Sequence, residues 1–125
     1  MSHFTTIKTK CTNQDLLVKS IQQIGYVAKI GKFNCRGYQG NKTTVDILIS
    51  LKGGYDIGFV YKDNNYEMVA DWWGINEIDE TEFIQSLNQQ YSIFSTTQEL
   101  QNKGFSLDQE TLSNGTVRLV ARKLG

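Results

Sequence analysis

The sequence predicts an α+β domain with a mainly antiparallel sheet, and three observations carry this prediction. A chain of 125 residues suits one hydrophobic core and is short for two. Three consecutive runs of alternating apolar residues are joined by links too short for a parallel crossover. Segments with helical spacing stand before and after these runs. We therefore expect one domain over residues 1–125, ordered as β-α-β, a three-stranded meander, a helical segment and a C-terminal β-hairpin.

The chain opens with a strand followed by a helix. Residues 4–10 alternate Thr and Lys with apolar positions, which is typical of a strand with a half-polar face. Apolar residues then recur at helical spacing over residues 16–24. Thr12 or Asn13 can cap the start of this helix, and Gly25 stands where a left-handed C-terminal residue is favoured.

A second strand, a loop and the meander come next. Residues 26–30 indicate a strand, whereas residues 31–42 contain three glycines and no periodicity, so we expect a loop there. Clean alternation over 44–51, 55–61 and 66–72 indicates three strands. Turn residues separate these three runs, namely Gly53-Gly54 and then Asp63-Asn64-Asn65.

The last third of the chain predicts helices and a hairpin. Asp79 followed three residues later by Glu82 forms a complete capping box at a helix start. Ser95 and Gln98 have the same spacing and predict a second, shorter helix. Two strands joined through an Asn-Gly turn within residues 105–121 are expected to close the chain as a hairpin.

The formal net charge is zero, but the charges are segregated along the chain. Residues 1–52 carry eight Lys or Arg against two acids, and residues 53–110 carry two against eleven. Residues 111–125 carry three against none. This distribution either gives a bipolar surface that orients a charged partner or, if the sheet interleaves the segments, a mixed surface.

Several function classes lack the residues that they need. The one histidine, His3, stands near the terminus, which disfavours His-based triads and zinc motifs. Cys11 and Cys35 have no C-x-x-C spacing, which leaves no zinc-ribbon or thioredoxin motif. No apolar run is long enough to span a membrane, and residues 1–10 lack a signal-peptide core. We expect no catalytic set, no metal site and no cofactor.

A glycine-rich segment forms the first candidate site. Gly37 to Thr43 resembles a phosphate-binding loop, but the Walker spacing requires glycines where this chain has Arg36 and Asn41. A flexible loop carrying Arg36 and Tyr38 could still bind an acidic or phosphate-bearing partner. The alternative is a structural turn whose cations are solvated.

The Trp pair in Asp71-Trp72-Trp73-Gly74 is the second candidate. Adjacent residues of a strand point to opposite faces of the sheet. Either both faces are covered, or one of the indoles of Trp72 and Trp73 is exposed as a platform for a partner protein or a nucleic-acid base.

Strand carboxylates form the third candidate. Asp46, Asp56, Glu67 and Asp71 are predicted on strand faces opposite the apolar residues. Convergence of these groups would permit metal-assisted hydrolysis. Pairing with Lys across an exposed sheet surface is the alternative.

Five segments resemble one known family over nearly the whole chain. The resemblance lies in residues 1–7, in Arg36-Gly37-Tyr38-Gln39-Gly40, in residues 54–61, in residues 66–74 with Ala70-Asp71-Trp72-Trp73-Gly74, and in residues 115–120. The chain is similar to the hypothetical chloroplast open-reading-frame thirty-five family, which algal plastids and cyanobacteria encode and which has no assigned activity. The resemblance implies a location in the plastid (chloroplast) stroma and no mechanism.

The expected function is a non-enzymatic protein-interaction or assembly module. Its predicted binding residues are Arg36, Tyr38, Gln39, Asp71, Trp72 and Trp73. Single-stranded nucleic-acid binding is an alternative that zero net charge does not favour. A small metal-assisted hydrolase using the strand carboxylates is the other alternative.

Overall fold

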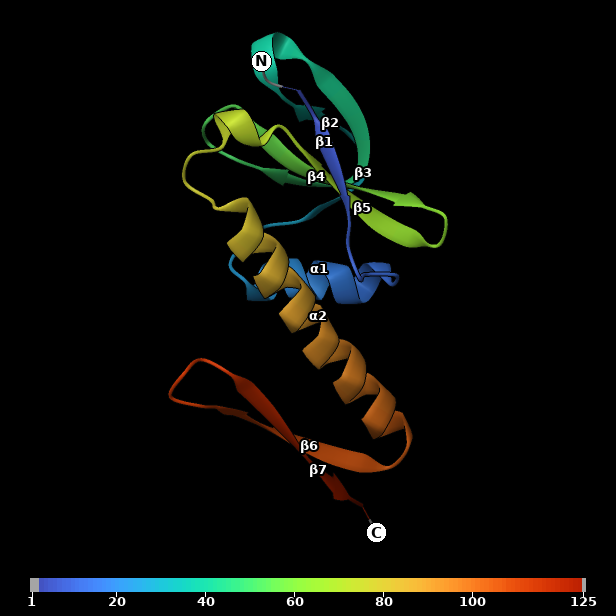
Figure 1. Cartoon of the computed structure of the whole chain (residues 1–125). Coiled ribbons are helices and arrows are strands. Elements are labelled where there is room, and N and C mark those ends of the chain that lie inside the picture. The colour runs from blue at the N-terminus through green and yellow to red at the C-terminus, as the bar shows by residue number, and fades with distance from the viewer. Residues whose placement is uncertain (1–2, 125) are drawn as a thin grey trace. The chain divides into compact units, whose positions relative to one another are not determined.

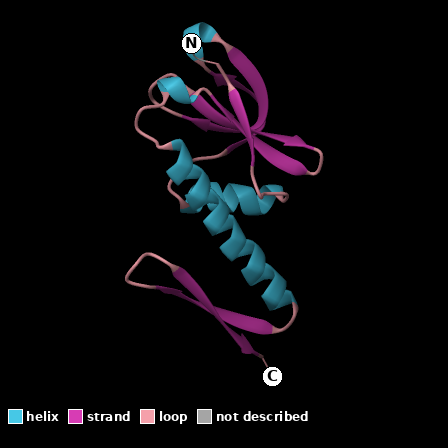
Figure 2. Cartoon of the chain, viewed as in Figure 1, coloured by secondary structure: helices cyan, strands magenta, loops and turns pink. Residues whose placement is uncertain are grey.

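The computed structural model describes residues 3–124 and contains two compact units, Met1–Tyr91 and Ser92–Gly125. Figure 1 labels their helices and strands, and Figure 2 distinguishes them by colour. The helices and antiparallel sheets confirm the predicted α+β class. Neither helix in residues 3–124 has an apolar stretch long enough to cross a membrane.

A five-stranded antiparallel sheet forms the centre of the first unit. Its strands are β1 (Thr5–Lys8), β2 (Lys29–Arg36), β3 (Lys42–Ser50), β4 (Asp56–Lys62) and β5 (Asn65–Ala70). They lie in the order β1-β5-β4-β3-β2, so the predicted meander β3-β4-β5 occupies the middle of the sheet. The turn predicted at residues 63–65 is confirmed. Asp63 and Asn64 have φ of 54° and 62°, and they link β4 to β5, which pair at Lys62 and Asn65.

Helix α1 (Gln14–Gln23) connects the two edge strands of this sheet, β1 and β2. Its start is set by Asn13, whose side chain accepts a hydrogen bond from Leu16 N at 3.0 Å. Gly25 has φ of 102°, a conformation that glycine adopts without steric cost. The expected cap and the expected terminating glycine are both confirmed.

The predicted boundary between a strand at 26–30 and a loop at 31–42 is wrong. Strand β2 runs through most of the expected loop, and its register against β3 shifts between Ile30 and Phe33. As an edge strand β2 has one neighbour, and Cys35 is its one buried residue. A bulge beside Gly31 and a largely exposed strand remove the alternation on which a strand prediction depends.

Helix α2 (Glu80–Asn102) is continuous, which corrects the prediction of two helices. Asp79 Oδ2 accepts a hydrogen bond from Glu82 N at 2.9 Å, as the capping box predicts. Ser95 and Gln98 instead lie within the helix. Extending a helix costs much less than nucleating a new one, so an internal capping signal does not interrupt it.

Asp79 caps the start of α2 and Ser95 lies within it, so the two residues provide a matched pair of substitutions. We expect Asp79→Ala to lower the free energy of unfolding by about 1 kcal/mol, because the N–H of Glu82 loses its acceptor. Ser95→Ala should be neutral or slightly stabilising, since alanine has the highest helix propensity. Chemical unfolding followed by circular dichroism measures both changes. An equal loss in the two variants would contradict the single-helix structure.

The main core lies between one face of the sheet and the helices of the first unit. Leu17 and Ile21 of α1, with Phe83 and Leu87 of α2, pack on sheet residues that include Phe59. A second, smaller cluster contains the buried Cys35, Val45 and Leu48, with Phe4, Phe33 and Val60 against them. Because Leu48 alternates with residues of the main core, this second cluster lies on the other face.

The sheet curls so that the end of β2 returns over β4 and β5. Cys35 Sγ lies 3.4 Å from the carbonyl oxygen of Asp56, although β3 separates these two strands in the sheet. The Phe4 ring lies against Gly37, where an added Cβ would be 2.6 Å from the ring. The curl therefore covers a sheet face that the alternation pattern leaves open to solvent.

The second unit contains the remainder of α2 and a two-stranded sheet formed by β6 (Phe105–Thr111) and β7 (Val117–Lys123). Gly115 has φ of 86° in the link between them. The predicted hairpin is confirmed. Exposed Arg118 and Glu110 pair across its strands.

Candidate functional site

Two short 3₁₀ turns bring distant aromatic residues together. One turn, Tyr38–Gly40, joins β2 to β3, and the other, Trp72–Gly74, follows β5. The rings of Tyr38 and Trp73 meet edge to face, with centroids 5.3 Å apart and planes at 81°. Trp73 is 66% exposed. The structure therefore contains an exposed indole held by a neighbouring aromatic ring.

The Trp pair does not lie on a strand as expected. Strand β5 ends at Ala70, so Trp72 and Trp73 follow it in a turn. Trp72 packs on Phe83 of α2 with centroids 6.2 Å apart, whereas Trp73 faces solvent. One indole thus belongs to the core and the other to the surface.

Asp71 is a buried carboxylate beneath these aromatic residues. Its side chain is 1% exposed, and Oδ2 accepts a hydrogen bond from Tyr38 N at 3.2 Å. Oδ1 is buried without a hydrogen-bond partner among the described residues. A buried polar atom without a partner costs free energy, so this oxygen requires an explanation.

Tyr55 is a neighbour of Asp71 that the sequence does not single out. Burial raises the pKa of Tyr55, and the nearby negative charges of Asp71 and ionised Tyr38 raise it further. Its ring occupies the space beside Gly74, where an added Cβ would lie 2.1 Å from Cζ. The glycine that follows the Trp pair therefore makes room for this ring.

We call Tyr38, Tyr55, Asp71 and Trp73 the aromatic-acid patch. A cavity of about 250 Å³ adjoins it. The cavity is lined by His3, Thr5, Ile7, Asp71, Trp72, Trp73 and Glu80. Its walls combine two indoles with two carboxylates, and every lining residue belongs to the first unit.

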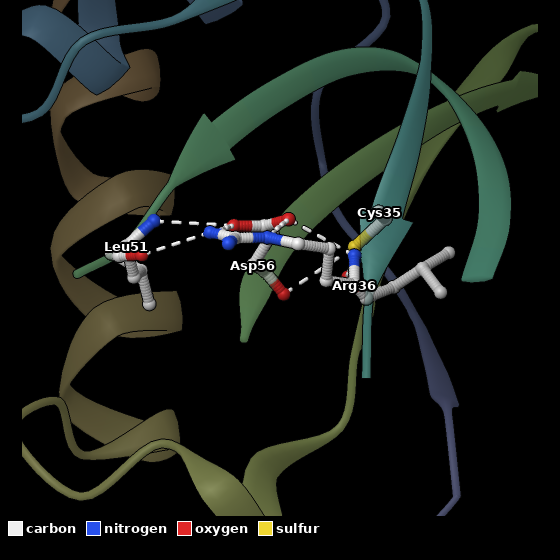
Figure 3. A network of polar contacts seen from close by, with 5 residues as sticks. Cys35, Arg36, Leu51 and Asp56 are labelled. Carbon is white, nitrogen blue, oxygen red and sulfur yellow. Dashed lines mark hydrogen bonds and ion pairs between the residues drawn. The ribbon is translucent and has the colours of Figure 1, made fainter. Parts of the chain in front are cut away.

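Arg36 is bound within the protein and is not part of the patch. Its Nε and Nη2 donate to Asp56 Oδ2 and Oδ1, each at 2.8 Å, and Nη2 also donates to Leu51 O at 3.0 Å. Figure 3 shows this network. Asp56 also accepts hydrogen bonds from the backbone N–H groups of Arg36 and Leu51. This arginine is engaged in holding the end of β2 against β4.

The ion pair between Arg36 and Asp56 shifts the pKa of both residues. Burial alone would raise the pKa of Asp56, but the bonds from Arg36 and from Leu51 N outweigh it and lower the pKa below its usual value. The pKa of Arg36 is raised chiefly by its hydrogen bond to Asp56. Both groups are therefore charged in the folded protein.

The remaining sequence candidates lie apart. Gln39 is exposed beside Tyr38 and has φ of 51°, which is uncommon for a residue other than glycine. Lys32, a cation at the start of the expected loop over residues 31–42, pairs with Asp46 at the surface. Tyr38, Asp71 and Trp73 are thus brought together, whereas Arg36 and Lys32 are held by other carboxylates.

The strand carboxylates do not converge. Asp56 and Asp71 are 1% exposed, so their predicted position on an exposed sheet face is wrong. The curled β2 covers Asp56, and Asp71 lies beyond the end of β5, where it accepts a hydrogen bond from Tyr38 N. Among residues 3–124, no three His, Cys, Asp or Glu side chains gather into a metal-binding group. These acids serve separate local roles.

Neither cysteine is suited to act as a nucleophile. Burial raises the pKa of Cys11 to about 11, although a hydrogen bond with Thr9 opposes the shift. Burial and the charge of Asp56 raise the pKa of Cys35 to about 12, against the opposing charge of Arg36. The reactive thiolate is therefore scarce at neutral pH.

Comparisons with known proteins find relatives that have no assigned function. The family described as "Protein of unknown function (DUF1257)" matches residues 20–120. "Uncharacterized protein ycf35" of Cyanophora paradoxa is 36% identical over 98% of both chains. The proteins of the same name from Guillardia theta and Pyropia yezoensis are 31% and 29% identical, each over 98% of both chains.

No solved structure matches the chain. The family match covers most of its length, and the three relatives carry the name of the family that the sequence resembles. The chain belongs to the DUF1257 family, together with the ycf35 proteins.

Proposed function

We propose that this protein is a non-enzymatic interaction module of the plastid stroma that binds a partner protein through the aromatic-acid patch. Its family membership points to the plastid, and the stromal location is part of the proposal. A role as an assembly or accessory factor is consistent with a binding surface built around an exposed indole.

The exposed indole of Trp73 is the observation that carries the proposal. Tryptophan is a large apolar side chain whose exposure has a cost, and it is the residue type most enriched among binding hot spots. The ring of Tyr38 packs edge to face against it, which restricts the indole before a partner binds. A preorganised aromatic anchor of this kind suits a protein interface.

The surroundings of Trp73 favour a protein over a nucleic acid. Asp71 and Glu80 line the adjoining cavity, and their negative charges would repel a phosphate backbone. The arginine nearest in sequence to Tyr38 is occupied by Asp56. Single-stranded nucleic-acid binding, which needs cations along the strand, is therefore the less favoured function.

An affinity experiment with matched variants tests the proposal. The wild-type protein, Trp73→Ala and Val27→Ala are immobilised and exposed to plastid extract. Val27 is 75% exposed and lies outside the patch, so it controls for loss of an exposed apolar side chain. We expect one stoichiometric protein on wild type and Val27→Ala and its loss from Trp73→Ala. Absence of such a protein, or equal retention by all three, would overturn the proposal.

A further inference from the structure

We propose that the cavity beside Trp73 binds a basic side chain, with arginine preferred, presented by the partner protein. This inference rests on the proposed function and specifies the chemistry of its partner. It follows from the charge balance of two buried carboxylates, from the walls of the cavity and from its size.

The two buried carboxylates differ in how their charges are balanced. Asp56 forms a bidentate ion pair with Arg36 and accepts two backbone hydrogen bonds (Figure 3). Asp71 is equally buried, yet it accepts one hydrogen bond, from Tyr38 N, and forms no ion pair among residues 3–124. A buried charge needs a partner of opposite charge, and Asp71 obtains none from the described chain.

The residue that carries the unpartnered oxygen also lines the cavity. Asp71 lines the cavity and carries the buried Oδ1 that has no hydrogen-bond partner in the described part of the chain. Glu80, in the first turn of α2, lines the same cavity and adds a second negative charge. A cation that enters the cavity would be attracted by both carboxylates.

Besides His3 and the two acids, four residues line the cavity, and these four favour a cation on an apolar stem. Trp72 and Trp73 both line the cavity, and the face of an indole ring attracts a cation more strongly than any other aromatic side chain does. Thr5 and Ile7 of β1 supply contacts for methylene groups. Arginine suits this environment better than lysine because its planar guanidinium can stack on an indole and donate to a carboxylate simultaneously.

The size of the cavity fits one side chain. Its volume is about 250 Å³, below the roughly 300–1,000 Å³ typical of sites for drug-sized ligands. A single basic residue within a peptide segment can enter, while the flanking backbone rests on the exposed Trp73. The cavity would therefore hold the basic side chain of the partner, and Trp73 would belong to the interface around it.

Titration of the full chain with Nα-acetyl-arginine amide tests the inference. Chemical shifts of the Trp73 indole N–H, followed by heteronuclear NMR, report binding at millimolar concentration. We expect saturable shifts with the arginine compound and at least about tenfold weaker binding of the neutral citrulline analogue, which keeps the shape and loses the charge. Equal binding of the two compounds would overturn the inference, as would larger shifts with a single-stranded oligonucleotide.

Two conservative variants localise the effect. Glu80→Gln keeps the size of this half-buried side chain and removes its charge, so it should weaken arginine binding severalfold. Asp71→Asn retains an oxygen for Tyr38 N and removes the charge, so it should weaken binding more strongly. If Asp71→Asn does not fold, Glu80→Gln and Trp73→Ala together decide the result, with binding to Trp73→Ala followed through the indole N–H of Trp72. Unchanged affinity in these variants would contradict a site in this cavity.

The outcomes separate this inference from the function on which it rests. Loss of the partner from Trp73→Ala, combined with no binding of the arginine compound, would retain the interaction module and reject the basic anchor. Binding of the arginine compound without any partner in plastid extract would retain the cation site and reject the proposed function.

Discussion

Replacing Asp56 with alanine is expected to lower the free energy of unfolding by about 2–3 kcal/mol, because the buried carboxylate accepts hydrogen bonds from the half-exposed Arg36 and from two backbone N–H groups. The carboxylate is 1% exposed and accepts hydrogen bonds from the Arg36 side chain and from two backbone N–H groups. Its removal leaves these donors without an acceptor at the place where β2 meets β4 and the β3–β4 loop.

Urea unfolding at neutral pH measures this loss. The control is Glu110→Ala, which removes the acid of an exposed Arg pair in the hairpin and should cost no more than about 1 kcal/mol. A loss for Asp56→Ala as small as that of the control would show that the network of Figure 3 contributes little to stability.

The same carboxylate makes stability depend on acid pH. The pKa of Asp56 in the folded protein lies below its ordinary value of 3.8, so the unfolded chain binds a proton more readily. The stability that Asp56 contributes is therefore present above about pH 4 and is lost as the pH falls through the folded-state pKa. Asp56→Asn should be less stable at neutral pH and should lose less stability between pH 5 and pH 3 than the wild-type protein, because it lacks this titration.

Replacing Gly58 with alanine is expected to destabilise the protein by about 1–3 kcal/mol through overpacking. An added Cβ would lie 2.4 Å from Val45 Cγ1, and both residues are buried. Valine is stiff about χ1, so it cannot swing aside without strain. The expected sign is opposite to the usual one, because alanine is ordinarily preferred to glycine within a strand by about 0.5–1 kcal/mol.

A compensating substitution tests the cause. Val45→Ala removes the clashing methyl groups, so Gly58→Ala should cost less in that background than in the wild-type protein. Gly53→Ala is the matched control, because its Cβ would meet no atom within 4 Å. Thermal unfolding of the four variants measures the coupling. Additive losses from Gly58→Ala and Val45→Ala would exclude the predicted contact.

Elements with complete local signals were predictable from the sequence. The three alternating runs of the meander, the helix cap at Asp79 and the Asn-Gly hairpin depend on residues close in the chain, and the structure confirms each one. The bounds of β2 were not predictable, because an exposed edge strand with a bulge shows no periodicity. The continuity of α2 was missed because a capping sequence was present where no helix end exists.

The candidate site was predictable in part. An adjacent Trp pair signals an unusual environment, but the sequence cannot show which indole is exposed, since the curl of the sheet and the position of α2 decide it. The pairing of Arg36 with Asp56 joins residues twenty positions apart, and no local pattern reports such a contact. Tyr55 and Glu80 were missed for the same reason, because tertiary structure alone brings them to Asp71 and the cavity.

The position of β1 in the sheet has a consequence for the synthesis of the chain. The ribosome makes β1 before β5, yet the two strands are neighbours in the sheet, and Thr5 pairs with Ala70. Chain segments emerge in order during synthesis, so β1 remains unpaired until β5 has been translated. Its Thr-Thr-Ile-Lys sequence suits that interval, because polar residues and lysine discourage association of a waiting strand with other nascent chains.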